Sequence, residues 1–254
     1  MKNFILSAMF FLPLFVAAQE QKKAERNINQ FADVTLGVGS SQFTGSASYV
    51  RNWKFGKKKR LEAGFGARFT SYFGNNQYYT TAPAILTSGK RGPGVFFASN
   101  IVPNIDSVLF PKSQVNSFNI TLNLGYNITK RIYAGLNVDL IGFSFGKKQN
   151  GFYYANNSGP VGVPVTAKPT TFNLFLVSDN DKGALNSEFF AKYKWNDSWS
   201  VKLAFQFLFA EYTTSTQVQT TPGGDKNDRF RNKMSGAAVG VAYSFKSLKK
   251  GKVK

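Results

Sequence analysis

The chain contains no cysteine and no histidine among its 254 residues. Without cysteine it has no disulfide, no thiolate nucleophile, no lipid-modified N-terminal cysteine and no Cys-ligated zinc or iron–sulfur cluster. Without histidine it lacks the usual general base and the commonest metal ligand. These two absences exclude most hydrolases and metalloenzymes, and we expect neither catalysis nor a cofactor.

Acidic residues are also scarce: 13 Asp and Glu stand against 32 Lys and Arg, which gives a formal net charge of +19. Such a basic excess can indicate nucleic-acid binding, so the location of the chain decides how the charge is interpreted.

The N-terminus indicates export. Lys2 precedes an apolar run over residues 4–16, and Val16-Ala17-Ala18 provides small residues before a polar stretch. This arrangement is typical of a secretory signal peptide, here residues 1–18 with cleavage near Ala18; an uncleaved membrane anchor is the alternative. An exported chain does not meet genomic DNA, so we expect no nucleic-acid partner.

Beyond residue 18 the sequence has no apolar run of the roughly 18–20 residues that a transmembrane helix needs. Apolar and polar residues instead alternate with a period of two, which predicts β-strands with one apolar and one polar face. Eight segments show this alternation: 34–38, 43–53, 61–70, 118–127, 132–140, 188–195, 201–209 and 237–245.

The connections between these segments alternate in length. Short turns are expected at 52–59, 129–130 and 196–198; the link at 40–42 is also short, although it falls in the series of long loops. Long connections rich in Gly, Pro, Asn, Ser and Thr are expected at 73–116, 146–183 and 214–232, and we predict them to be mobile and without regular structure. Loops of roughly 40 residues are unusual in compact soluble domains, whereas alternating turns and long extracellular loops are typical of membrane barrels.

The predicted fold is therefore all-β: an eight-stranded antiparallel up-and-down transmembrane β-barrel. It would comprise a signal peptide (1–18), a periplasmic segment (19–30), the barrel (31–245) and a basic tail (246–254). A soluble exported β-protein remains an alternative, because alternation alone does not say whether the apolar face meets lipid. Aromatic residues gather at the strand ends, as in interfacial girdles. The expected periplasmic girdle is Tyr126, Trp195, Trp199, Tyr243 and Phe245, and the outer girdle is Phe69, Tyr72, Phe118, Phe143, Phe209 and Tyr212.

Charged residues on the polar strand faces form the best candidate site. An eight-stranded barrel is just wide enough for side chains to fill it, so these charges should pair inside the lumen. A gated ion path is the alternative interpretation. The residues are Glu62, Arg68, Asp139, Glu188, Lys192, Lys194 and Lys202.

Two other motifs have simpler interpretations than a site. Asp179 and Asp181 lie in Asp-Asn-Asp-Lys-Gly, which is typical of a turn, and the remaining ligands of a calcium loop are missing. Gly64-Phe65-Gly66 is not followed by a helix, so it indicates strand packing and not a phosphate loop.

The signal peptide, the eight alternating segments and the last strand, Ala-Val-Gly-Val-Ala-Tyr-Ser-Phe at 238–245, resemble small bacterial outer-membrane barrels of the OmpA/OmpX type. The resemblance implies insertion by the barrel-assembly machinery, which would recognise Tyr243 and Phe245 at the end of the terminal strand. Here nine further residues follow Phe245, and we expect no separate peptidoglycan-binding domain. Barrel enzymes of the outer membrane rely on a catalytic histidine, which this chain lacks.

The basic excess is concentrated in the expected periplasmic segments, where it could contact anionic lipid headgroups or acidic cell-wall polymers. We predict a non-enzymatic, porin-like barrel in the Gram-negative outer membrane. Its role would be structural, or recognition and adhesion through extracellular loops 73–116, 146–183 and 214–232. A narrow channel or transport-associated barrel is the second hypothesis.

Overall fold

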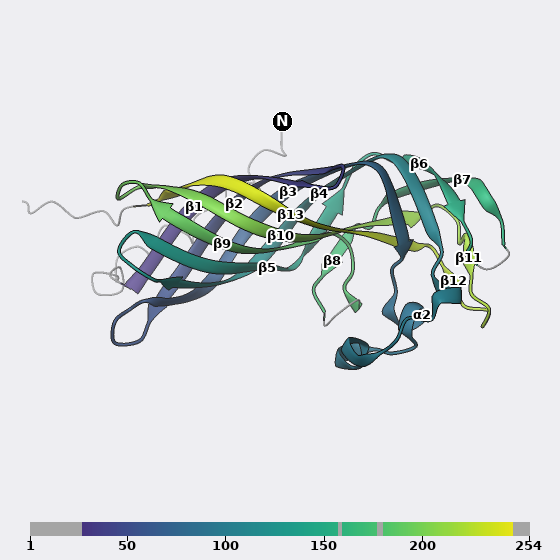
Figure 1. Ribbon diagram of the computed structural model, residues 1–254, viewed down its shortest axis with the longest axis horizontal. Coiled ribbons are helices and arrows are strands. Elements are labelled where there is room, and N and C mark those ends of the chain that lie inside the picture. Colours follow the sequence, from purple (N-terminus) through teal and green to yellow (C-terminus); the bar gives the residue numbers. More distant parts are fainter. Residues whose placement is uncertain (1–26, 157–158, 177–179, 246–254) are drawn as a thin grey trace, which may run out of the picture.

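The structure is a computed structural model that describes residues 27–156, 159–176 and 180–245. The predicted signal peptide, its cleavage near Ala18 and the basic tail at 246–254 lie outside the described residues. The described chain is built mainly from antiparallel β-strands that close into an elongated barrel (Figure 1).

Eight strands form the barrel, each hydrogen-bonded to the next in sequence order around the wall, and the last pairs with the first. This confirms the predicted eight-stranded antiparallel up-and-down barrel. The strands are β1 (Ile28–Gly39), β2 (Gln42–Phe55), β3 (Leu61–Thr81), β4 (Ser107–Asn127), β5 (Ile132–Phe145), β9 (Leu185–Lys194), β10 (Trp199–Thr214) and β13 (Arg229–Ser244).

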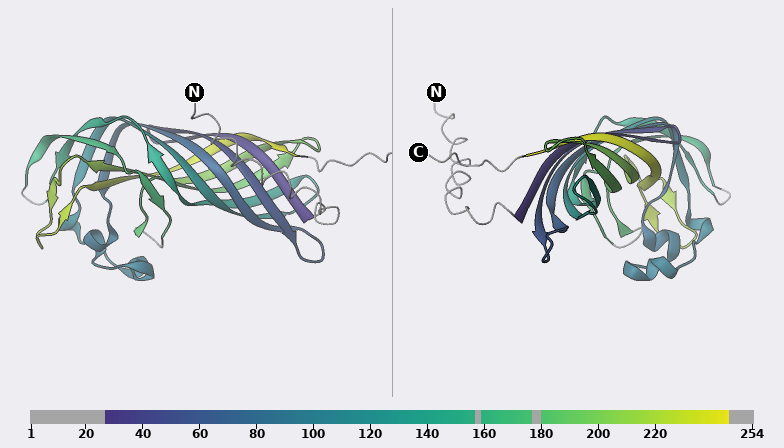
Figure 2. Two further views of the ribbon diagram at one scale, coloured as in Figure 1. Left: turned by 180° about the vertical axis from the view of Figure 1, so that it is seen from behind. Right: turned by 60° about the vertical axis from the view of Figure 1, so that its left-hand side comes forward.

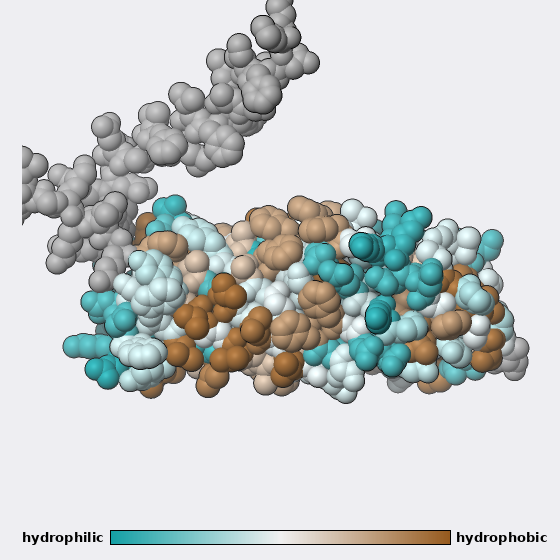
Figure 3. Space-filling view, turned by 90° about the horizontal axis from the view of Figure 1, so that it is seen from above, coloured by the Kyte–Doolittle hydropathy of each residue, from teal (hydrophilic) through white to brown (hydrophobic). Residues whose placement is uncertain are grey.

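The two faces of the wall differ in polarity as the alternation predicts. On β1, Val34 and Leu36 are 60 % and 50 % exposed, whereas Asp33 and Thr35 between them are 3 % and 0 % exposed. Exposed apolar residues consequently occur on all eight barrel strands, and on the face in Figure 3 they form a band between two hydrophilic zones. Apolar residues outside and polar residues inside are the arrangement of a wall that faces hydrocarbon, which identifies a transmembrane barrel and not a soluble core.

The two ends of the barrel are different. The turn end carries the short connections 56–60, 128–131 and 195–198, together with the start of β1 and the end of β13. The loop end carries the short β1–β2 turn at 40–41 and all the long connections. Figure 2 shows both ends of the described chain leaving from the turn end. Among the described residues no helix is long and apolar enough to cross a membrane.

The prediction that the three long connections lack regular structure is wrong. Residues 73–81 and 107–116 are extensions of β3 and β4, which are 21 residues long each. Segment 146–183 contributes β6 (Gln149–Tyr154), β7 (Val161–Pro169) and β8 (Phe172–Leu174). Segment 214–232 contributes the hairpin of β11 (Gln219–Thr220) with β12 (Lys226–Asn227) and the start of β13.

These additional strands build a second closed ring, which we call the outer ring. The loop-end part of β3 pairs with β4, β4 with β6, β6 with β7, β7 with β10, β10 with β13, and β13 again with β3. A six-stranded ring therefore stands on the eight-stranded barrel, because β1, β2, β5 and β9 end below it. Because the outer ring closes, its backbone hydrogen-bond ladder has no free edge. Segments that look like loops in the sequence are therefore ordered strands.

A residue with a left-handed backbone on β3 marks the boundary between the two rings. Asn76 has a left-handed backbone (φ 49°), and it lies between the paired positions Asn75–Lys112 and Gln77–Phe110. Tyr72 and Tyr79 both face the interior although they are seven positions apart, so the inward parity of β3 changes between them, where Asn76 lies. The period-two pattern is broken there, which is why the sequence pattern ends before the strands do.

The remaining elements lie beside the loop end. Between β3 and β4 the chain forms α2 (Ala84–Ser88), η2 (Gly92–Phe97) and η3 (Val102–Asn104). Strand β8 extends the wall by pairing with β5 above β9. Figure 1 shows the helices and β8 projecting to one side of the barrel axis.

Candidate functional site

Buried charges fill the middle of the lumen, and Arg68 on β3 is at their centre. Its Nε and Nη2 donate to Asp139 Oδ1 at 2.9 and 2.5 Å, and its Nη1 lies 3.1 Å from Glu188 Oε2. The second oxygen of Asp139 accepts from the Asn119 amide at 2.7 Å and from the Asn186 backbone N–H at 2.9 Å. Strands β3, β4, β5 and β9 are thereby joined across the interior.

Lys202 on β10 extends this cluster to β1. Its Nζ lies 2.7 Å from Glu188 Oε2 and 2.9 Å from Asp33 Oδ1, and Gln206 Nε2 donates to the other Glu188 oxygen at 2.6 Å. The side chains of all the ion-pair partners have no exposed surface. A fully desolvated charge is tolerated only when opposite charges and hydrogen bonds surround it, and each charge of this cluster lies within 3.1 Å of an opposite charge.

The remaining charges of the predicted lumen set lie nearer the turn end. Glu62 is buried and accepts from the amides of Asn29 and Asn127, both at 2.7 Å. Lys192 is 3 % exposed, and its Nζ lies 3.0 Å from the centroid of the Phe31 ring and 4.5 Å from that of Tyr133. Lys194 is half-buried at the rim. The structure therefore brings Arg68, Asp139, Glu188 and Lys202 together and places the other three apart from them.

Sequence reasoning missed Asp33, which completes the cluster. The signal that could have found it is its phase: Asp33 has the inward parity of Thr35 and Gly37 on β1. With Asp33 included, three carboxylates pair with Arg68 and Lys202 in the middle of the lumen.

Aromatic side chains close the interior above the charges, inside the outer ring. Tyr79, Phe110 and Tyr212 are fully buried and pack with centroid separations of 5.1, 5.3 and 4.8 Å. Tyr153 and Phe230 add a further edge contact at 6.2 Å. The assignment of Tyr72 and Tyr212 to the outer girdle is therefore wrong. Both face inward, Tyr72 because it shares the parity of Thr70 on β3 and Tyr212 because it lies within the outer ring.

A second aromatic layer narrows the lumen at the turn end. Tyr133 stacks on Phe190 at 5.9 Å and contacts the edge of Phe31 at 6.4 Å. The wall makes room for these rings with glycine: a Cβ on Gly125 would lie 1.7 Å from the Tyr133 hydroxyl oxygen. Between the two aromatic layers the charge cluster occupies the middle of the lumen, so side chains fill the interior at these levels.

The outside of the outer ring carries an exposed apolar row. Tyr78, Leu109, Phe152 and Pro164 are successive cross-strand partners on β3, β4, β6 and β7. Tyr78 is 53 % and Phe152 41 % exposed. Polar side chains including Asn75, Lys112 and Gln114 lie between this row and the apolar band in the sequence of β3 and β4. Figure 3 shows a hydrophilic zone on the loop-end side of the band.

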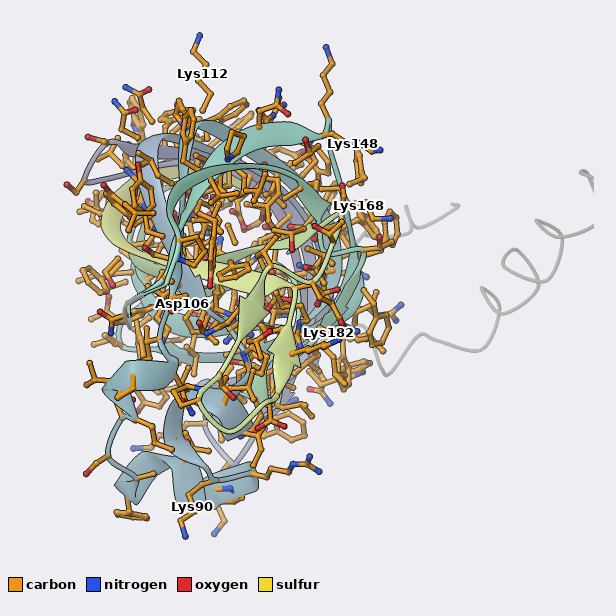
Figure 4. The ribbon with its side chains drawn as sticks, turned by 90° about the vertical axis from the view of Figure 1, so that its right-hand side faces the viewer. Lys90, Asp106, Lys112, Lys148, Lys168 and Lys182 are labelled. Carbon is orange, nitrogen blue, oxygen red and sulfur yellow. The ribbon has the colours of Figure 1, made fainter. Side chains whose placement is uncertain are left out.

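Basic side chains surround the loop end. In Figure 4, which views the molecule from this end, Lys112 and Lys148 extend away from the ring, and Lys168 and Lys182 lie along one side. The outer ring therefore combines a row of apolar side chains with a basic border.

A buried carboxylate fixes the edge of the outer ring. The Tyr153 hydroxyl donates to Asp106, and the other Asp106 oxygen accepts from the Asn156 backbone N–H at 2.9 Å. Burial raises the pKa of Tyr153, and the Asp106 carboxylate raises it further. Tyr153 therefore remains a neutral donor over the physiological range and ties β6 to the segment before β4.

No group of three or more Asp, Glu, His or Cys side chains able to hold a metal ion occurs in the described part of the chain. The Asp181 carboxylate accepts from the Leu176 backbone N–H at 2.6 Å, so it has a local contact within its own segment, and Asp179 lies outside the described residues.

Tyr243 and Phe245, the expected assembly signal, lie on the outer face at the turn end. Phe245 donates its backbone N–H to Gln30 O at 2.9 Å, and its ring contacts those of Tyr49 and Tyr243 at 6.0 and 5.4 Å. Trp199 packs edge-on against Tyr243 at 5.0 Å. These aromatic residues form part of the belt at this end.

Comparison with known proteins gave structural neighbours only. No family model matches the chain, and no curated protein matches it. Among solved structures, a major outer membrane protein from Thermus thermophilus has a TM-score of 0.36 at 11 % identity, covering 85 % of this chain and 99 % of that one. Neisserial surface protein A has a TM-score of 0.33 at 8 % identity, covering 86 % and 96 %. The Yersinia pestis attachment invasion locus protein Ail, solved with the heparin analogue sucrose octasulfate, has a TM-score of 0.31 at 7 % identity, covering 86 % and 97 %.

Proposed function

We propose that the chain is a non-enzymatic barrel of the bacterial outer membrane that serves recognition or adhesion at the cell surface. The observation that carries this proposal is the exposed row of Tyr78, Leu109, Phe152 and Pro164 on the outer ring. Exposed apolar side chains on a rigid sheet beyond the membrane band are typical of a protein-binding surface. The predicted extracellular segments 73–116 and 146–183 supply this surface as ordered strands.

The packed interior favours this role over a channel. Arg68 and Lys202 are fully desolvated within their ion pairs, and aromatic layers lie above and below them. An ion crossing the lumen would have to displace both layers and the cluster. The ion pairs accordingly have a structural role, which joins the strands of the wall.

The proposed topology places the turn end in the periplasm. Basic turn residues such as Lys57, Lys58 and Arg60 would then face anionic headgroups of the inner leaflet or acidic cell-wall polymers. Insertion by the barrel-assembly machinery through Tyr243 and Phe245, as in barrels of the OmpA/OmpX type, belongs to the same proposal.

Cell fractionation tests the location. The protein should sediment with outer membranes and remain there after a high-salt wash, because its apolar band is exposed all round. A periplasmic pool that stays soluble after ultracentrifugation would contradict the proposal.

Surface binding is tested by the retention of cells on beads. Cells that display the protein are passed over octyl-coated beads and over heparin-coated beads. The double variant Tyr78→Ser/Phe152→Ser should lower retention on octyl beads several-fold, because it removes the centre of the row. Ile128→Ser is the matched control: Ile128 is 47 % exposed but lies at the turn end, so its substitution should leave retention unchanged. Equal losses for both variants would show that the row is not the binding surface.

A further inference from the structure

A small helical lobe projects sideways at the loop end, and we call residues 84–104 the lateral lobe. It comprises α2, η2 and η3, which are held together by hydrogen bonds from Ile101 N to Thr87 O at 2.7 Å and from the Asn104 amide to Leu86 O at 2.8 Å. Figures 1 and 4 show the lobe beyond the outline of the barrel, with Lys90 at its far side.

The lobe displays apolar side chains on its outside. Phe97 is 93 % exposed, and Val102 and Ile101 are 60 % and 40 % exposed. The Phe97 ring lies on an ordered segment and is in contact with whatever lies outside the protein. Contact with water is unfavourable for so large an apolar side chain, whereas contact with an apolar phase is favourable.

The lobe is continuous with the apolar band of the barrel. Phe143 on β5 pairs with Phe172 on β8, and both are exposed in the band. The chain continues from β8 to Phe175 and Leu176, which are 42 % and 43 % exposed. Asn180 then donates its side-chain amide to Gly92 O at 3.3 Å, which joins this segment to the start of η2. Exposed apolar side chains therefore continue from the wall through β8 to Leu176, and Asn180 contacts the lobe.

The charge of the lobe has one sign. Lys90 and Arg91 precede η2 and are exposed, and residues 84–104 contain no Asp or Glu. Apolar side chains next to an uncompensated basic pair are the composition of segments that lie in a membrane interface, with the apolar groups at the acyl boundary and the cations among anionic headgroups.

We propose that the lateral lobe is an interfacial anchor that rests on the outer leaflet beside the barrel. Phe97 enters the headgroup–acyl boundary, and Lys90 and Arg91 bind anionic groups of the lipid headgroups. This inference rests on the proposed membrane insertion. The anchor would fix the rotation and tilt of the barrel and thereby the direction in which the outer ring presents its apolar row.

Spin labelling tests the anchor directly, because the cysteine-free chain needs no background substitution. Phe97→Cys is labelled with a nitroxide in vesicles of equimolar phosphatidylcholine and phosphatidylglycerol, and collisions with oxygen and with a water-soluble nickel chelate are compared. Substitution of Phe97 removes no core contact, since the side chain is exposed. Val34→Cys in the apolar band and Lys226→Cys on β12 provide the lipid and water references.

The ratio of oxygen to nickel collisions at position 97 should be several-fold above that at position 226 and below that at position 34. Adding Lys90→Gln and Arg91→Gln should lower the ratio at 97 in these vesicles and leave it unchanged in pure phosphatidylcholine. A ratio at 97 equal to that at 226, with position 34 in lipid, would overturn the anchor alone. A water-exposed label at position 34 would instead overturn the transmembrane barrel. Spin–spin broadening at 97 that disappears on dilution with unlabelled protein would identify a second copy, and not lipid, as the occupant.

Discussion

Each residue of the barrel strands is constrained by the side of the wall that it faces. On β1 the outward Leu36 is 50 % exposed, and its neighbours Thr35 and Gly37 are buried. Hydrocarbon on one side and a packed polar lumen on the other impose opposite demands on adjacent positions.

Because outward residues face hydrocarbon, a charge introduced among them should destabilise the barrel. Leu36→Arg should lower the free energy of unfolding by up to about 4 kcal/mol, because it places a guanidinium in the apolar band. Urea titration in lipid vesicles, followed by tryptophan fluorescence, measures this change. Ser40→Arg, in the exposed turn that follows the same strand, is the control and should change stability little. Comparable losses for both would contradict the assignment of the band.

Because inward charges are buried with their partners, removing one charged side chain from the cluster should destabilise the barrel. Arg68→Leu should cost about 3–5 kcal/mol, because it leaves Asp139 and Glu188 buried with too little positive charge. Adding Asp139→Asn should recover part of the loss, since one uncompensated carboxylate becomes neutral.

The same titration measures these variants, and Arg60→Leu in the exposed β2–β3 turn should stay within about 0.5 kcal/mol of the wild type. A double variant no more stable than Arg68→Leu alone would argue against electrostatic coupling of the pair.

At the scale of elements, the outer ring depends on its aromatic core. β6 and β7 are short strands, and their inward residues Tyr153 and Ala167 pack into the cluster that contains Tyr79, Phe110 and Tyr212. Without this core the ring would consist of isolated hairpins, which are marginally stable in water.

Phe110→Ala should therefore destabilise the ring by about 3–5 kcal/mol while the eight-stranded barrel persists. Hydrogen exchange read by mass spectrometry should show faster exchange over residues 149–169 and unchanged exchange over residues 28–39. Faster exchange in both segments would mean that the two rings unfold as one unit. Leu109→Ala, on the outer face of the same strand, is the control and should leave both segments protected.

At the scale of the whole molecule, the protein is a membrane-spanning barrel that supports an ordered ring. Its interior holds the charge cluster between two aromatic layers. Outside, a hydrophilic zone follows the apolar band (Figure 3), and the outer ring carries the apolar row.

Because side chains fill the middle of the lumen, we predict that the barrel does not conduct ions. Purified protein in planar bilayers should give little or no steady conductance, because ions would have to enter a desolvated ion-pair cluster. The Phe110→Ala variant should also show little or no conductance, since Arg68, Lys202 and their carboxylate partners still fill the middle of the lumen. Large, stable openings of the wild-type protein would favour the channel hypothesis.

The sequence by itself determined the eight-stranded barrel. The period-two alternation assigned each strand and its two faces, because hydrocarbon and lumen select opposite residue types at every second position. The same phase put Glu62, Arg68, Asp139, Glu188, Lys192 and Lys202 in the interior, and it could have added Asp33.

Only the tertiary structure decided the partners of these charges and the form of the loop end. Which carboxylate meets Arg68 depends on strand order and register around a closed wall, which no local pattern encodes. The outer ring escaped prediction because β6 and β7 are short, the inward parity of β3 changes at Asn76, and the ring pairs segments that lie far apart along the chain. Local sequence specifies which face of a strand is apolar, whereas ring closure depends on contacts that exist only once the chain has folded.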